Sequence, residues 1–169
     1  RNLFRYDLTL RKVVRPYKND YREKVINIVE KALPNTELDI ISKSLEKDKY
    51  VFRSYSDVKP PEYHLLNLKE PSLKYLGSEY PELENFTLAS MESVSYKARD
   101  GLEIPAFLTL PVGAKKENLP LVVYPHGGPW AHDEWGFDNY VQFMASRGYA
   151  VFQPQFRGST NYGIEHEEA

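Results

Sequence analysis

The chain has 169 residues, 41% hydrophobic and 27% charged, with a formal net charge of −2, which is an ordinary globular composition. This composition excludes a disordered chain, and the lack of a basic excess argues against nucleic acid or an anionic membrane as a partner. The absence of cysteine excludes disulfides and a thiol nucleophile, and the four histidines show no common zinc spacing, so no metal or cofactor is predicted.

The N-terminal half predicts short strands around one amphipathic helix. An alternating stretch over residues 2–8 predicts a strand. Residues 20–33 predict a helix, because Val25, Ile26 and Val29 fall on one helical face, and Pro34 ends it. Asp20 and Glu23 have the spacing of a capping box at the start of this helix.

Four short strand-like runs follow the helix, separated by turn residues such as Val58-Lys59-Pro60-Pro61. Four consecutive antiparallel strands are typical of one blade of a β-propeller and equally of a small meander sheet, and the pattern alone leaves both open. Residues 80–86 then predict a linker. The predicted strands cover residues 37–42, 49–56, 62–68 and 73–76.

The second half predicts a hairpin followed by a strand–helix–strand unit. Residues 91–98 and 102–110 alternate and are joined at Asp100-Gly101, a strong hairpin signal. Residues 119–124 predict a buried strand and residues 149–153 another. Between them, residues 138–147 predict a helix that ends at Gly148 and has apolar residues at helical spacing, namely Tyr140, Val141, Phe143 and Met144. A hairpin feeding a parallel sheet is how an α/β-hydrolase domain begins.

The candidate chemistry lies in His126-Gly127-Gly128-Pro129, directly after the strand at 119–124. The carboxyl ends of parallel strands face the ligand crevice in α/β folds. Two adjacent glycines let the backbone approach a substrate, and a backbone N–H there can donate to the oxyanion of an acyl-transfer intermediate. A tight turn that needs glycine only for its dihedral angles explains the motif equally well.

Five blocks of the second half carry a resemblance that favours the first interpretation. In this order and spacing they resemble the prolyl oligopeptidase family of serine peptidases, in particular its acylaminoacyl-peptidase and dipeptidyl-peptidase-like branch. Residues 94–111 also look like the start of that family's hydrolase domain, and residues 1–80 resemble the last part of its propeller with weaker motifs. The five blocks are Leu119-Pro120-Leu121-Val122-Val123, His126-Gly127-Gly128-Pro129-Trp130, Trp135-Gly136-Phe137-Asp138, Ala145-Ser146-Arg147-Gly148-Tyr149-Ala150-Val151 and Phe156-Arg157-Gly158-Ser159-Thr160-Asn161-Tyr162-Gly163.

The resemblance implies a parent protein in which a β-propeller caps an α/β-hydrolase domain. Residues 1–80 would be the C-terminal part of the propeller. Residues 81–169 would be the N-terminal part of the peptidase domain, a mixed sheet with helices. The implied activity is cleavage of short peptides by Ser-His-Asp acyl transfer.

The same resemblance implies a role for individual residues of the His-Gly-Gly-Pro motif. The backbone amide of Gly128 would be an oxyanion-hole donor. His126 is not the triad histidine, because the family places that residue near its C-terminus, and it is expected to hold the loop. The residues expected to support the site are His126, Gly127, Pro129 and Arg157. For Arg157 a structural ion pair or a tether to the backbone is favoured over a contact to a substrate carboxylate.

The triad itself is not expected in this chain. No Gly-x-Ser-x-Gly motif occurs, and Ser159 has no glycine two residues after it. The sequence begins at Arg1 without a signal-peptide pattern, and both ends are interpreted as cuts inside a longer protein. The chain alone is therefore predicted to be inactive, and the compartment stays open between cytoplasm and periplasm.

Other residues near the motif have two interpretations each. Trp130, Trp135 and Phe137 line a pocket or, as favoured, pack where the helix seats on the sheet. Asp133 and Glu134 face a substrate amine or, as favoured, are solvated loop charges.

Three alternatives to a peptidase fragment stay open. These are a non-catalytic binding or assembly piece, an esterase on the same fold, and one chain of a nicked enzyme that a companion chain completes. The propeller-like half argues against a small esterase. The expected partners are a short peptide and, because an incomplete parallel sheet exposes its edges, either the rest of the hydrolase domain or a second copy.

Overall fold

A computed structural model describes the chain except residues 1–4, 8–11, 15–19, 71 and 129. The chain divides into two compact units, Arg1–Phe86 (unit 1) and Thr87–Ala169 (unit 2). The predicted assignment of residues 1–80 to a propeller and 81–169 to a hydrolase domain stays a prediction. Within the described residues, no helix has the length and apolar character needed to cross a membrane.

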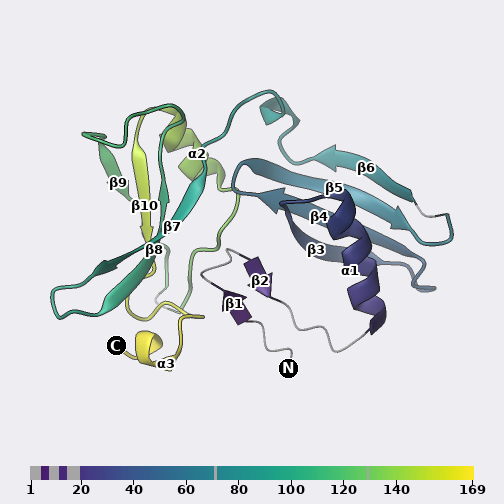
Figure 1. The fold of residues 1–169 in the computed structure, drawn as a ribbon, viewed down its shortest axis with the longest axis horizontal. Coiled ribbons are helices and arrows are strands. Elements are labelled where there is room, and N and C mark those ends of the chain that lie inside the picture. The colour runs from purple at the N-terminus through teal and green to yellow at the C-terminus, as the bar shows by residue number, and fades with distance from the viewer. Residues whose placement is uncertain (1–4, 8–11, 15–19, 71, 129) are drawn as a thin grey trace. The chain divides into compact units, whose positions relative to one another are not determined.

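Unit 1 contains a four-stranded antiparallel sheet in the order β3-β4-β5-β6, as the four strand-like runs predicted (Figure 1). Its strands are β3 Glu37–Lys43, β4 Lys49–Ser56, β5 Lys59–Asn67 and β6 Ser72–Ser78. Each pairs with its neighbour in sequence, a meander topology that a propeller blade and a simple sheet share.

Unit 1 also contains shorter elements. β1 Arg5–Asp7 pairs with β2 Lys12–Val14, and a short 3₁₀ helix, η1, covers Pro81–Leu83. β1 falls inside the strand predicted over residues 2–8, whose other residues lie outside the described ones.

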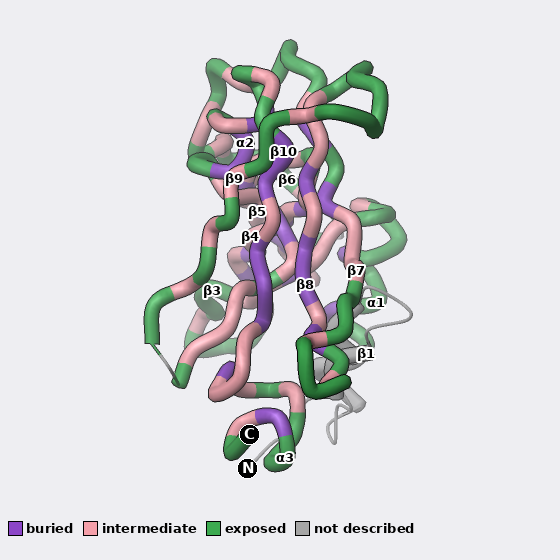
Figure 2. The backbone as a smooth tube through the Cα atoms, turned by 90° about the vertical axis from the view of Figure 1, so that its left-hand side faces the viewer, coloured by how far each residue is buried: buried purple, intermediate pink, exposed green. Residues whose placement is uncertain are grey.

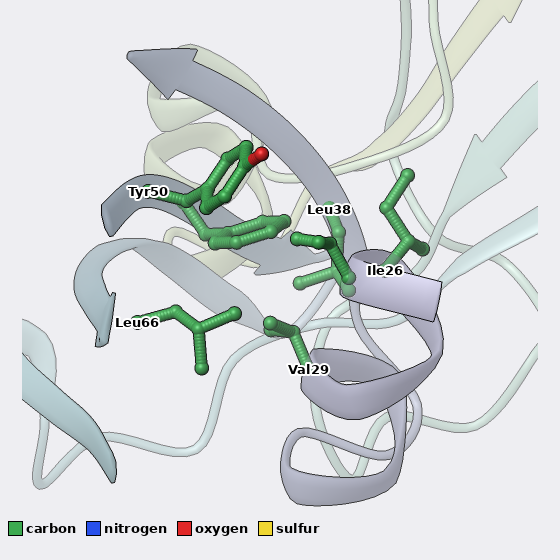
Figure 3. Close-up of a cluster of buried hydrophobic side chains, with 7 residues drawn as sticks. Ile26, Val29, Leu38, Tyr50 and Leu66 are labelled. Atoms are coloured by element: carbon green, nitrogen blue, oxygen red, sulfur yellow. The ribbon is translucent and has the colours of Figure 1, made fainter. Parts of the chain in front are cut away.

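The helix α1 (Asp20–Ala32) covers one face of the sheet and forms the core of unit 1. The periodicity prediction of this helix is confirmed, with Val25, Ile26 and Val29 at most 3% exposed. Figure 3 shows side chains of the helix gathered against Leu38, Tyr50 and Leu66 of the strands. Phe52 is fully buried in the same cluster. The predicted capping box at Asp20 and Glu23 concerns side chains outside the described ones.

The turn predicted over residues 58–61 is wrong in extent, because β5 already begins at Lys59. The register of β4 and β5 shifts between Ser54 and Ser56, opposite the two prolines. Proline lacks an N–H to donate, and a strand start with a bulge is where a sheet tolerates it. Pro61 still contributes its carbonyl, which accepts from the Glu79 N–H at 2.9 Å.

The second half begins with the predicted hairpin, formed by β7 (Met91–Lys97) and β8 (Glu103–Thr109). The Gly101 N–H donates to the Ala98 carbonyl at 2.9 Å, and Gly101 has a φ of 91°. Glycine adopts this left-handed conformation without strain, which is why Asp-Gly signals the turn.

The strand–helix–strand prediction for unit 2 is confirmed. β9 (Leu121–Val123) leads through α2 (Asn139–Ser146) to β10 (Ala150–Pro154), which runs parallel to β9 and antiparallel to β8. The described sheet is therefore mixed, in the order β7-β8-β10-β9, and a short helix α3 (Ile164–Glu167) follows.

One burial prediction in unit 2 is wrong. The strand predicted as buried, β9, exposes Leu121 and Val123 by more than half, while buried residues run through β8 and β10 (Figure 2). β9 is the edge of the described sheet, so no strand lies beyond it to cover these side chains. On α2, Tyr140 and Phe143 are 65% and 59% exposed, and the face packed inward is instead Val141, Gln142 and Ala145.

Candidate functional site

The candidate site is the loop of residues 124–138 that joins β9 to α2, termed here the β9–α2 loop. Its start is fixed by the Tyr124 N–H, which donates to the Phe152 carbonyl at 2.8 Å and continues the pairing with β10. Its end is fixed by Asp138, whose carboxylate accepts from the N–H groups of Tyr140 and Val141 as the N-cap of α2. The loop thus lies at the carboxyl end of a parallel strand, the edge at which α/β folds bind ligands.

The two glycines of the motif differ in how much room their surroundings leave for a Cβ atom. Gly128 has a φ of 150°, and a Cβ there would lie 3.1 Å from the Trp130 nitrogen and 3.4 Å from the Ala131 nitrogen. A Cβ on Gly127 would meet nothing within 4 Å. The position that strictly requires glycine is therefore Gly128, whereas Pro129 lies outside the described residues.

His126 is held on both ring nitrogens and on one ring face. Its Nδ1 lies 2.7 Å from the Gly127 carbonyl oxygen, and its Nε2 lies 2.7 Å from Ser159 Oγ. Because a carbonyl only accepts, Nδ1 carries the proton and the Ser159 hydroxyl donates to Nε2. The imidazole also stacks on Phe156, with ring centroids 4.3 Å apart. These contacts fix the ring beside the glycines.

The Ser159–His126 pair has the distance of an activated serine nucleophile and its base. Ser159 is, however, completely buried, and its N–H donates to the Phe156 carbonyl at 2.9 Å in a tight turn. A nucleophile must reach a substrate carbonyl, so this burial assigns the pair to structure rather than to attack.

Farther along, the loop is tied to the segment that follows β10. The Thr160 N–H donates to the Ala131 carbonyl at 2.9 Å, and His132 Nδ1 lies 2.9 Å from Thr160 Oγ1. Asn161 Nδ2 lies 2.9 Å from His132 Nε2. The second half of the loop is thereby attached to the same segment that holds His126.

Asp133 is not the solvated loop charge that the sequence favoured. Its side chain is partly buried, and its Oδ2 atom is buried without a hydrogen-bond partner. Burial raises the pKa of the Asp133 carboxyl, and the nearby Asp138 adds to this, while His126 opposes it. Glu134, by contrast, is 78% exposed as expected.

We predict that Asp133→Asn stabilises the full-length protein by about 1 kcal/mol at pH 7, because it removes a poorly solvated charge with an unpaired oxygen. A carboxyl with a raised folded pKa contributes stability that is complete below its ordinary value of 3.8 and lost as the pH rises through the folded pKa. The gain in melting temperature should therefore be present at pH 7 and absent below pH 3.8.

The exposed neighbour Glu134 provides the control, since Glu134→Gln should change stability by less than about 0.5 kcal/mol at either pH. A melting temperature of Asp133→Asn that is lower than wild type at pH 7 would contradict this account of Asp133.

Arg157 forms the structural ion pair that the sequence favoured. Its Nη2 donates to both carboxylate oxygens of Asp100, at 2.5 and 2.6 Å. This bond lowers the pKa of the Asp100 carboxyl. Arg157 therefore joins the segment after β10 to the β7–β8 turn, and its guanidinium is engaged there.

The three aromatic residues of the loop behave differently from one another. Trp135 packs as expected, since its Nε1–H donates to the Met91 carbonyl of β7 at 3.2 Å. Phe137 is partly buried. Trp130 is 78% exposed, so the packing expected of it is absent from the described structure.

Sequence reasoning missed the residues after β10 that hold the loop, chiefly Gln155, Ser159 and Thr160. The available signal was Gln153-Pro154-Gln155 at the end of an apolar strand, because a buried glutamine needs partners for both amide atoms. Among the described residues, no three His, Asp or Glu side chains come together to hold a metal ion.

Comparison with known proteins shows the family of the chain. No family model matches the chain. Over 130 residues it is 37% identical to dipeptidyl aminopeptidase BIII of Pseudoxanthomonas mexicana, covering 72% of this chain and 19% of that protein. The chain belongs to the prolyl oligopeptidase family.

Solved structures agree with this membership at the level of the fold. The acylaminoacyl peptidase of Pyrococcus horikoshii matches with a TM-score of 0.56 and 22% identity, over 76% of this chain and 20% of that one. A prolyl endopeptidase matches with a TM-score of 0.59 and 20% identity, over 81% of this chain and 20% of that one. This chain thus spans about a fifth of the length of the proteins that it matches.

Proposed function

We propose that this chain is the junction segment of a serine peptidase that cleaves short peptides by Ser-His-Asp acyl transfer. Residues 1–80 would end a β-propeller, and residues 81–169 would begin the α/β-hydrolase domain. The triad serine, aspartate and histidine would be supplied from outside this chain, which lacks a Gly-x-Ser-x-Gly motif. This chemistry needs no metal or cofactor.

The observation that carries the proposal is the place of His126-Gly127-Gly128 in unit 2. In α/β-hydrolases one oxyanion-hole N–H comes from the loop between the third strand and the first helix. The β9–α2 loop follows the third strand of unit 2 and precedes its first long helix. Its His-Gly-Gly motif is of the kind that lipases and esterases use there. The Gly128 N–H is therefore the proposed donor, and the second donor would follow the nucleophile.

The proposed roles of the supporting residues follow from their contacts. His126 would hold the loop through Ser159 and Phe156, and Arg157 would brace the segment after β10 through Asp100. Gly127 would contribute its carbonyl, which is bonded to the His126 ring, and Pro129 would restrict the backbone after Gly128.

The exposed edge of unit 2 supports a partner for the described sheet. Leu121 and Val123 of β9 share one face with Phe152, since Val123 pairs with Phe152 in register. We propose that the rest of the hydrolase domain covers this edge, or a second copy of the chain when it is isolated. A monodisperse monomer of the isolated chain by light scattering would contradict this.

The function is tested by labelling with a fluorophosphonate probe, which reacts with activated serines. The full-length gene product should be labelled, and the isolated 169-residue chain should not. Ser159→Ala in the full-length protein should still be labelled, because the buried Ser159 is not the reactive serine, but more slowly, because His126 loses one of the bonds that hold the loop. Three results would overturn the proposal. These are labelling of the isolated chain, complete loss of label in a folded Ser159→Ala variant, and a full-length protein that is not labelled.

A further inference from the structure

Gln155 makes an unusually complete set of hydrogen bonds to the β9–α2 loop. Its side chain is fully buried directly after β10. Its Oε1 accepts from the Asp133 N–H at 3.1 Å, and its Nε2–H donates to the Asp133 carbonyl at 2.9 Å. One side chain therefore pairs with both backbone groups of one loop residue, as a neighbouring strand would.

The backbone of Gln155 is equally fixed. Its N–H donates to the Pro105 carbonyl of β8 at 2.8 Å, and its carbonyl accepts from His166 Nε2 at 2.8 Å. The amide that holds the loop is thus attached to the sheet on one side and to α3 on the other. A loop residue bonded to such an anchor has little freedom to shift.

The part of the loop around Gly128 is short and is attached at several points, since Ala131 and His132 are bonded to Thr160 as well. His126 is bonded to Ser159, Asp133 is bonded to Gln155, and Gly128 lies between them in the chain. Four residues separate Gly128 from Asp133 in the chain, so a movement of the Asp133 backbone is transmitted to the glycine turn through a short stretch of backbone. Oxyanion stabilisation is sensitive to such movement, since a misplacement of about 1 Å can reduce the rate by about 10²-fold.

We propose that Gln155 is a positioning residue for the peptidase reaction, which holds the Gly128 N–H in place through its two bonds to the Asp133 backbone. The inference rests on the proposed function, because it assigns Gln155 a part in the same oxyanion hole. Gln155 does not touch the substrate and acts only through the loop. Its amide is preorganised in the folded protein, so no bond has to rearrange as the oxyanion forms.

Unit 2 contains a second buried glutamine that makes the same pair of hydrogen bonds and serves as an internal control. Gln142 of α2 is also buried, and its Oε1 accepts from the Ala89 N–H at 2.9 Å. Its Nε2–H donates to the Ala89 carbonyl at 2.7 Å. Gln142 therefore holds a segment outside the β9–α2 loop by the same pair of bonds. A substitution at either glutamine removes the same two kinds of hydrogen bond, but only a substitution at Gln155 frees the β9–α2 loop.

The experiment compares Gln155→Glu with Gln142→Glu in the full-length protein. Glutamate keeps the oxygen that accepts from Asp133, but its second oxygen then faces the Asp133 carbonyl and repels it. Protonation of that buried carboxylate restores a donor. For Gln155→Glu we expect kcat at pH 8 to fall about 10- to 100-fold with KM changed less than about threefold, and to recover partly as the pH is lowered. Gln142→Glu should lose a similar amount of melting temperature, while its kcat stays near the wild-type value over the same pH range.

A readout independent of catalysis separates the inference from the proposed function. Amide hydrogen exchange over residues 126–136 should become faster in Gln155→Glu and stay unchanged in Gln142→Glu. If Gln155→Glu fails to fold, Gln155→Met, which removes both bonds with little change in volume, gives the same comparison.

The outcomes are distinguishable. Equal effects of the two glutamate variants on kcat, its pH profile and loop exchange would overturn the positioning role and leave the proposed function intact. Faster loop exchange with unchanged kcat would also overturn it. A wild-type protein without peptidase activity would overturn the proposed function and this inference together.

Discussion

Replacing Gly128 by alanine is expected to reduce kcat of the full-length peptidase by about 10²–10³-fold, the loss typical for removal of one oxyanion donor. The new Cβ would lie 3.1 Å from the Trp130 nitrogen, and the φ of 150° is one that an L-residue rarely adopts. The backbone must therefore shift, and the shift displaces the N–H of this residue. The measurement is steady-state kinetics on a chromogenic peptide, together with the rate of fluorophosphonate labelling.

Gly127→Ala provides the matched comparison within the same motif. A Cβ at Gly127 meets nothing within 4 Å. Its effect on kcat should therefore be at least about tenfold smaller than that of Gly128→Ala, because the loop keeps its path. Equal losses in the two variants would show that Gly128 has no special part in the reaction. An unchanged kcat in Gly128→Ala would remove the oxyanion role from this loop.

Local signals in the sequence were sufficient wherever one short segment determines its own structure. Three features follow from the spacing of residues that are close together in the sequence. They are the Asp100-Gly101 turn, the helix over residues 20–32 and the strand–helix–strand unit. The meander of unit 1 was predicted for the same reason, since each strand pairs with the next. The exposure of β9 was not predicted, because the burial of a strand depends on which strands lie beside it.

In the candidate site, too, the features that depend on neighbouring residues were predicted and the contacts between distant residues were not. The glycine motif and its place after a strand could be predicted, as could the ion pair of Arg157 in kind but without its partner Asp100. The bonds that hold the loop join residues 22 and 33 positions apart in the chain, at Gln155 and at Ser159. No local pattern encodes such pairs, and they become visible only when β10 lies beside β9. The partial burial of Asp133 follows from the same packing and was missed for the same reason.

Truncation of Phe52 to alanine is expected to be the most destabilising single change in unit 1. Phe52 lies on β4 between β3 and β5, is 0% exposed and packs with Tyr50, Leu66 and the helix residue Val29. Removing a buried phenylalanine ring from such a core costs about 3–5 kcal/mol through lost burial and the cavity left behind. The measurement is native-state hydrogen exchange of the β4 amides in the full-length protein, which reports the opening of this sheet without requiring two-state unfolding.

The expected acceleration of exchange is about 10²–10⁴-fold for amides that exchange through opening of the sheet. Leu45→Ala is the control in the same unit, because Leu45 is fully exposed in the β3–β4 turn and its truncation should cost less than about 0.5 kcal/mol. If Phe52→Ala and Leu45→Ala changed β4 exchange equally, the helix-on-sheet core would not be what stabilises unit 1. A large effect confined to Phe52→Ala would show that this core holds the four strands together, whichever larger architecture they belong to.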